Sequence, residues 1–129
     1  MANQILTHIS HVGAEHSSWL RGIEFYNDEL AILKSRLQEV SYKNTKEDAK
    51  KQVDHFQNQF LVQETNLNRL EHEINAHFKN MKSDIDTHAQ HLGNSTIAEH
   101  DALRDRYIVQ EKIINELRHE FNRFLCEVM

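Results

Sequence analysis

The chain has 129 residues, 39% of them hydrophobic and 27% charged, with three Gly, no Pro and a formal net charge of −5 at pH 7. This length fits a single domain over residues 1–129. The acidic balance gives no basic footprint for nucleic acid or an anionic membrane surface, and no apolar run approaches the ~20 residues of a membrane span. The lack of Pro favours long uninterrupted helices, because Pro breaks helix interiors.

A first helix is predicted over about residues 3–41. Its apolar stripe alternates steps of three and four residues, the heptad spacing of a coiled coil. The stripe consists of Ile5, Ile9, Val12, His16, Trp19, Ile23, Tyr26, Leu30, Leu33, Leu37 and Val40. Gly13 and Gly22 lie within this helix, each a local weakness of roughly 1 kcal/mol relative to Ala.

A second helix is predicted over about residues 45–91, where Thr45 and Asp48 match a capping box. Its heptad stripe is Ala49, Val53, Phe56, Phe60, Gln63, Leu67, Leu70, Ile74, His77, Met81, Asp84, His88 and His91. The segment 83–86 is the one place where this helix could break, because its Ser and Asp side chains compete for backbone hydrogen bonds.

A third helix is predicted over about residues 96–128, after a left-handed C-cap at Gly93 and a capping box formed by Thr96 and Glu99. Its stripe is His100, Leu103, Tyr107, Gln110, Ile114, Leu117, Phe121, Phe124 and Val128. Two short turns between three helices predict an all-α, antiparallel up-down-up bundle with coiled-coil packing. Pairing of two chains through Leu61, Val62, Phe78 and Ile85, which flank the stripe, remains open.

Ten histidines are the most unusual feature of the composition, and five of them occupy heptad positions where an apolar residue is expected. The short turns predict which positions meet across the bundle. They place His77 beside Ile9 and Gln110, and His88 beside His100. They also place His16 beside Leu70 and Leu117, and Trp19 beside Leu67 and Phe121. A polar residue on such a stripe costs stability unless a partner satisfies it.

One interpretation is a metal site that binds iron, manganese or zinc through ligands from facing helices. The candidate ligands are His16, His72, Glu73, Glu111, Glu116 and His119. Glu116 and His119 form a Glu-x-x-His, which places both side chains on adjacent turns of one face. A ferritin-like di-iron site needs two such motifs, and the sequence holds one.

The alternative is that these histidines are satisfied by neighbouring side chains, with His77 bonded to Gln110 and His16 to Glu73 or Glu120. A related possibility is a pH switch, in which several histidines take up protons together near pH 6 and destabilise the bundle.

Enzyme motifs such as a Gly-rich phosphate loop or a Cys-x-x-Cys are absent from the sequence. The single cysteine, Cys126, cannot form an internal disulfide, and a reducing cytoplasm is the expected setting. Amides on the second helix, at Gln57, Asn58, Asn66 and Asn68, suggest an interaction surface. The sequence therefore predicts a non-enzymatic structural or protein-interaction bundle, with self-association as a homodimer left open.

Three runs carry a family resemblance: residues 15–20 (EHSSWL), 55–60 (HFQNQF) and 116–121 (ELRHEF). Together they resemble a group of small all-helical bacterial proteins of unassigned function. The resemblance spans most of the chain and implies a cytoplasmic bacterial setting. None of the three runs is a catalytic signature, so the resemblance implies no activity.

Overall fold

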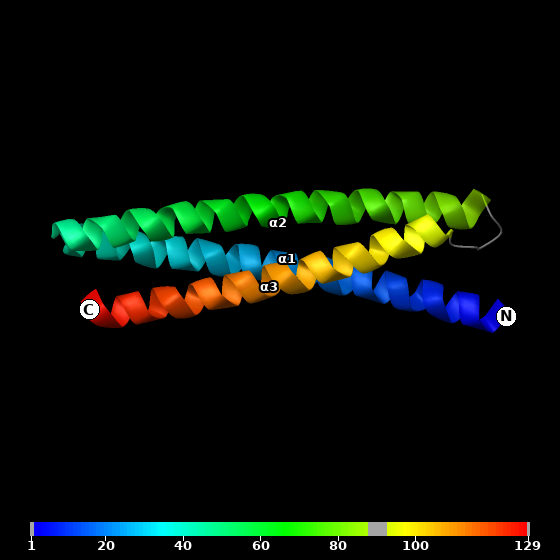
Figure 1. Ribbon diagram of the computed structural model, residues 1–129, viewed down its shortest axis with the longest axis horizontal. Helices are drawn as coiled ribbons and strands as arrows, with labels where there is room; N and C mark the ends of the chain where they lie inside the picture. The colour runs from blue at the N-terminus through cyan, green and yellow to red at the C-terminus, as the bar shows by residue number, and fades with distance from the viewer. Residues whose placement is uncertain (1, 88–92, 129) are drawn as a thin grey trace.

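The computed structural model describes the backbone of residues 2–87 and 93–128, with side chains from residue 11 onward except at Thr87. Three α-helices account for nearly all of it: α1 (Ala2–Lys43), α2 (Glu47–Thr87) and α3 (Asn94–Val128). They pack as a three-helix bundle, and this confirms the all-α prediction. Figure 1 shows α2 along one side of the bundle, with α1 and α3 crossing each other along the other side.

The turn between α1 and α2 is tight and is closed by Asn44. The backbone N–H of Asn44 donates to the carbonyl of Val40 at 3.0 Å, and its side-chain Nδ2 donates to the same carbonyl at 3.2 Å. The next helix starts when Lys50 N–H donates to Lys46 O. The predicted capping box at Thr45 is therefore wrong, because Thr45 precedes the first helical hydrogen bond. Glu47 and Asp48 lie in the first turn instead, where the helix dipole favours acids.

The segment 83–86 remains helical, so the break considered there does not occur. Its Asp84 instead accepts a hydrogen bond from the hydroxyl of Thr96, which is buried inside α3. Thr96 is thus not the N-cap that the sequence predicts. The carbonyl of Gly93 accepts the first α3 bond, from Ile97 N–H, and Gly93 does not adopt a left-handed φ. The predicted end of the second helix, residues 88–91, lies outside the described residues.

The predicted heptad stripes form the core. Aromatic rings dominate the end near the α1–α2 turn, where Phe56, Phe60 and Phe121 are buried with Phe124. Their ring centroids lie 5.2 Å apart for Phe56–Phe121 and for Phe60–Phe121. A small second cluster, Val12 and Met81, covers the other end with Phe78, Ile85 and Ile97 packed against it. Phe78 and Ile85 are therefore half-buried within the chain, and pairing of two chains through them stays a prediction.

The predicted register between α2 and α3 is wrong. His77 meets His100 instead of Gln110, and Gln110 meets Gln63. The chain reverses between Thr87 and Asn94, several residues earlier than the turn position assumed from sequence. Ten residues of α-helix correspond to ~15 Å, so this shift replaces every predicted α2–α3 layer.

Candidate functional site

The six predicted metal ligands are placed in different surroundings. The ring of His16 stacks on Phe78, with centroids 4.1 Å apart, and its Nε2 is buried without a hydrogen-bond partner. Burial lowers the pKa of His16 below its usual value of 6.5, an effect that a hydrogen bond to Asn75 partly opposes. His16 is thus a neutral ring packed against an aromatic side chain.

Two of the three predicted carboxylate ligands, Glu73 and Glu111, have partners of other kinds. Glu73 forms an ion pair with Arg106 between α2 and α3. Glu111 accepts hydrogen bonds from Tyr26 at 3.0 Å and from Tyr107 at 3.4 Å. Burial and the Glu111 charge raise the pKa of Tyr107 to about 12, so both tyrosines remain proton donors at neutral pH.

The remaining three, His72, Glu116 and His119, are exposed. Within residues 11–86 and 93–128, no group of three or more His, Cys, Asp or Glu side chains is arranged to hold a metal ion. The six residues are therefore not brought together in this structure, and metal binding stays a prediction from the sequence.

The structure assembles a different polar cluster, centred on Glu15 of α1. Arg104 donates to both carboxylate oxygens, from Nε at 2.6 Å and from Nη2 at 2.5 Å. His100 and His11 approach Oε1 at 3.2 and 3.1 Å. The bonds from Arg104 lower the pKa of Glu15 to about 2, although burial opposes them, and His100 adds to the lowering. Glu15 is therefore an ionised carboxylate with only 17% of its side chain exposed.

His100 extends this cluster into the core. Its Nδ1 lies 3.3 Å from Nε2 of His77 on α2, and its ring stacks on Trp19 with centroids 4.7 Å apart. Both histidines occupy heptad positions, so the sequence identified them as unusual. It did not pair them, because that pairing depends on the α2–α3 register. Glu15 lies beside the stripe and has no local sequence signal.

Tyr107 of α3 lies directly over the backbone of Gly22 on α1. A Cβ atom built on Gly22 would lie 1.8 Å from the Tyr107 hydroxyl and 2.9 Å from Cζ. The close approach of α1 and α3 at this level thus requires glycine. What the sequence presents as a helix weakness is a contact point between helices.

A second buried polar contact joins α2 and α3 in the middle of the bundle. Gln110 Nε2 donates to Gln63 Oε1 at 2.6 Å, and both side chains are buried. A single buried amide pair of this kind fixes register, because any other alignment leaves unpaired polar groups among apolar ones.

We expect Gln63→Leu to destabilise the bundle by about 1 kcal/mol, because it leaves the Gln110 amide buried and unpaired. The double variant Gln63→Leu/Gln110→Leu should regain most of that loss. Urea unfolding of the two single variants and the double variant measures both effects as a double-mutant cycle. Strictly additive losses would contradict the importance of the amide pair.

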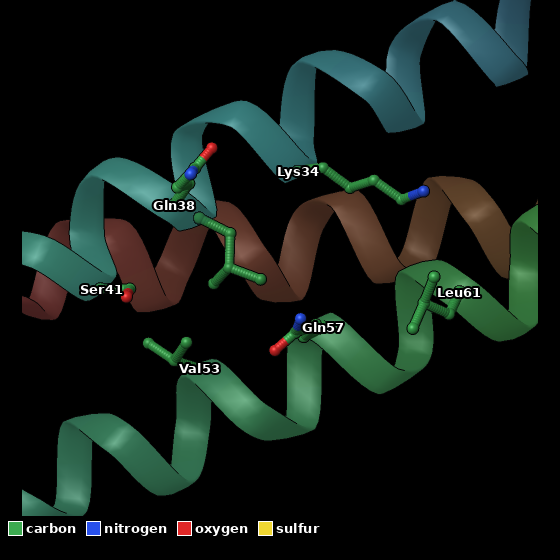
Figure 2. Close-up of a pocket in the computed structure, with 7 residues that line it drawn as sticks. Lys34, Gln38, Ser41, Val53, Gln57 and Leu61 are labelled. Carbon is green, nitrogen blue, oxygen red and sulfur yellow. The ribbon is translucent and has the colours of Figure 1, made fainter.

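The described surface has a groove of about 320 Å³ between α1 and α2, near their turn. Figure 2 shows its lining, which includes the amides of Gln38 and Gln57 and the apolar side chains of Val53 and Leu61. Lys34 at its edge is paired with Glu64 of α2. The groove holds no pair of groups suited to acid–base or nucleophilic chemistry.

Large apolar side chains remain exposed on neighbouring sides of α2 and α3. Val109 and Ile113 follow Arg106 at steps of three and seven residues, so they share the side of α3 from which Arg106 reaches Glu73 of α2. Val62 lies three turns before Glu73 on the matching side of α2. Their exposed fractions are 41% for Val62, 54% for Val109 and 37% for Ile113. We refer to these three residues as the α2–α3 strip.

No protein-family model, no curated protein and no solved structure matches the chain. Among the described residues, no helix combines the length and the apolar character that crossing a membrane requires.

Proposed function

We propose that this chain is a non-enzymatic structural or protein-interaction bundle that self-associates through the α2–α3 strip. The observation that carries the proposal is the exposure of Val62, Val109 and Ile113 on neighbouring sides of two long antiparallel helices. An exposed apolar strip of this kind suits a helix from a partner, which would bury the strip and extend the heptad packing. A second copy of the chain offers such a helix.

The surroundings of the strip favour its use as a protein interface and not as a catalytic site. The Arg106–Glu73 ion pair borders it, so the apolar strip has a charged end. Phe78 and Ile85, predicted from sequence as further dimer contacts, pack inside the chain. Of the four residues predicted to pair two chains, Leu61 and Val62 are exposed, and Val62 belongs to the strip.

We expect Val109→Asp to weaken self-association by about tenfold or more, which corresponds to ~1.4 kcal/mol. A carboxylate placed in the strip would lose its hydration when a second chain covers it. Sedimentation velocity over a concentration series measures the dissociation constant. Circular dichroism should show unchanged helix content, because Val109 is exposed within one chain.

Ile108→Asp is the matched control. Ile108 has nearly the same exposure, 53%, but it is rotated by ~100° around α3, away from the strip. Its substitution should leave self-association unchanged. Equal weakening by both variants would contradict the strip as the interface, and a monomer at every concentration would contradict the second copy as partner.

The alternative function from the sequence, a bundle that binds iron, manganese or zinc, is decided by elemental analysis of protein purified without chelator. Near-stoichiometric metal, together with a rise in the melting temperature when that metal is added, would replace the interaction proposal. His16→Leu should then abolish the metal-dependent rise if His16 is a ligand.

A further inference from the structure

His77 of α2 and His100 of α3 form a buried pair of imidazoles. Their side chains are only 2% and 4% exposed, and Nε2 of His77 lies 3.3 Å from Nδ1 of His100. The ring centroids are 5.3 Å apart. Each ring therefore has one nitrogen facing the other ring and one nitrogen facing outward.

A carboxylate stands at each outer nitrogen. Glu15 of α1 lies 3.2 Å from Nε2 of His100, and Glu99 of α3 lies 3.5 Å from Nδ1 of His77. The second contact is within ion-pair distance but is not aligned as a hydrogen bond, so Nδ1 of His77 is buried without a hydrogen-bond partner. The four residues form a chain from Glu15 through His100 and His77 to Glu99, which we call the imidazole chain.

The imidazole chain has one proton fewer than it needs to form a hydrogen bond in every gap. It has three gaps, and each needs one hydrogen between the two facing atoms. A neutral imidazole brings one N–H and an ionised carboxylate brings none, so two neutral rings fill two gaps. The gap between His77 and Glu99 is the unfilled one, because it is the longest and its nitrogen has no bond. Both rings then carry their hydrogen on Nε2.

We propose that the imidazole chain is a single-proton site: one proton added at Nδ1 of His77 completes the third bond and fastens His77 of α2 to Glu99 of α3. The proton comes from solvent at the Glu99 end, since half of the Glu99 side chain is exposed. A second proton does not bind, because it would make both rings point an N–H group at each other in the gap between them, with no acceptor.

The surrounding charges fit one added charge at His77. From α1, Glu15 and His11 approach the His100 end of the imidazole chain. From α3, Arg104 lies there too, with its charge compensated by Glu15 and Asp101.

The remaining imidazoles are poorly suited to carry that charge. Burial lowers the pKa of His100, which keeps that ring neutral. Burial also lowers the pKa of His16 on α1, with the charge of His77 as a smaller contribution, so His16 stays neutral as well.

This device differs from the pH switch that the histidine content suggests. That switch requires several histidines to take up protons together and to destabilise the bundle. The imidazole chain takes up one proton and gains a link between α2 and α3. The imidazole chain does not involve the residues of the α2–α3 strip, so its test is independent of the test of the proposed function.

The test is NMR of the full chain labelled with ¹⁵N in its imidazole rings, recorded as a pH series. We expect Nδ1 of His77 to gain its hydrogen as the pH falls, while both nitrogens of His100 keep their neutral shifts. In Glu99→Gln, the His77 ring should stay neutral at pH values at which it is protonated in the unaltered chain. Glu120→Gln, at another exposed acid of α3, is the control and should leave the titration of His77 unchanged.

Three results would overturn the proposal. These are protonation of His100 before or together with His77, a His77 ring that stays neutral until the chain unfolds, and a titration that Glu99→Gln does not alter. Because Glu99 is exposed, its substitution leaves the core intact and the variant can be measured in the folded state.

Discussion

Replacing Glu15 by Gln is expected to lower the free energy of unfolding by about 3 kcal/mol at pH 7. The pKa of Glu15 falls from its usual 4.5 to about 2 on folding, and each unit corresponds to ~1.4 kcal/mol. Arg104 supplies most of this stabilisation through its two hydrogen bonds to Glu15. His100 adds one further hydrogen bond. Gln keeps the shape of the side chain but removes the charge that these donors neutralise.

The loss should depend on pH in a defined direction. A carboxyl whose pKa is lowered by folding stabilises the folded state above its unfolded value, and this contribution disappears as the pH falls through the folded value. The difference in stability between the unaltered chain and Glu15→Gln should therefore be complete above about pH 5 and shrink toward pH 2. Urea unfolding at several pH values measures this difference.

Two comparisons sharpen the Glu15 experiment. Glu24→Gln, at an exposed acid on α1, is the matched control and should change stability little. Combining Glu15→Gln with Arg104→Gln should cost less than the sum of the two single changes, because the pair is lost only once. A constant difference between pH 2 and pH 7 would contradict the role of the Glu15 charge.

Gly22→Ala is expected to destabilise the bundle by about 1–2 kcal/mol, although Ala is the better helix former. The new Cβ would lie 1.8 Å from the Tyr107 hydroxyl, so Tyr107 or the whole of α3 must move away from α1. Tyr107 cannot swing out without loss, since it bonds Glu111 and packs near Trp19. Thermal unfolding followed by circular dichroism measures the effect.

Gly13→Ala is the matched control on the same helix. Nothing lies within 4 Å of the Cβ that it would add, so it should stabilise the chain by up to about 1 kcal/mol. In the background of Tyr107→Phe, Gly22→Ala should cost less, because the hydroxyl makes the closest contact. If both glycine substitutions stabilise the chain equally, α3 does not pack against Gly22.

Much of the fold can be predicted from the heptad spacing alone. The stripes include nearly every buried residue, from Val12 to Val40 on α1 and from Phe56 to Met81 on α2. This works because a long helix in a bundle has one face to bury, and a repeat of three and four residues marks that face. The absence of Pro gives the helix lengths to within a few residues.

The register and the caps could not be predicted in the same way. A heptad stripe permits several alignments that differ by a whole repeat, and the polar pair Gln63–Gln110 is satisfied in only one of them. Thr96 resembles an N-cap in its local sequence, yet its hydroxyl donates a hydrogen bond to Asp84 on another helix. Such side chains are assigned by tertiary contacts, which local sequence does not contain.

The candidate site was also predicted only in part from the sequence. His77 and His100 are conspicuous in the sequence because they replace apolar residues, whereas Glu15 and Glu99 look like ordinary surface acids. Among the residues predicted as metal ligands, Glu73 instead bonds Arg106 and Glu111 bonds tyrosines. Composition therefore identified the imidazoles, and only the three-dimensional register identified their carboxylate partners.

The two ends of the core also differ in what an opening of the helices would expose. At the α1–α2 turn, opening would transfer four buried phenylalanines into water, at roughly 2–3 kcal/mol for each buried ring. At the α2–α3 turn, it would expose the smaller cluster of Val12 and Met81 and would hydrate two imidazoles and a carboxylate, groups that water also satisfies. Local unfolding should accordingly begin at the histidine end and spread toward the phenylalanines. The hairpin of α1 and α2 is then the last part of the bundle to release its protected amides.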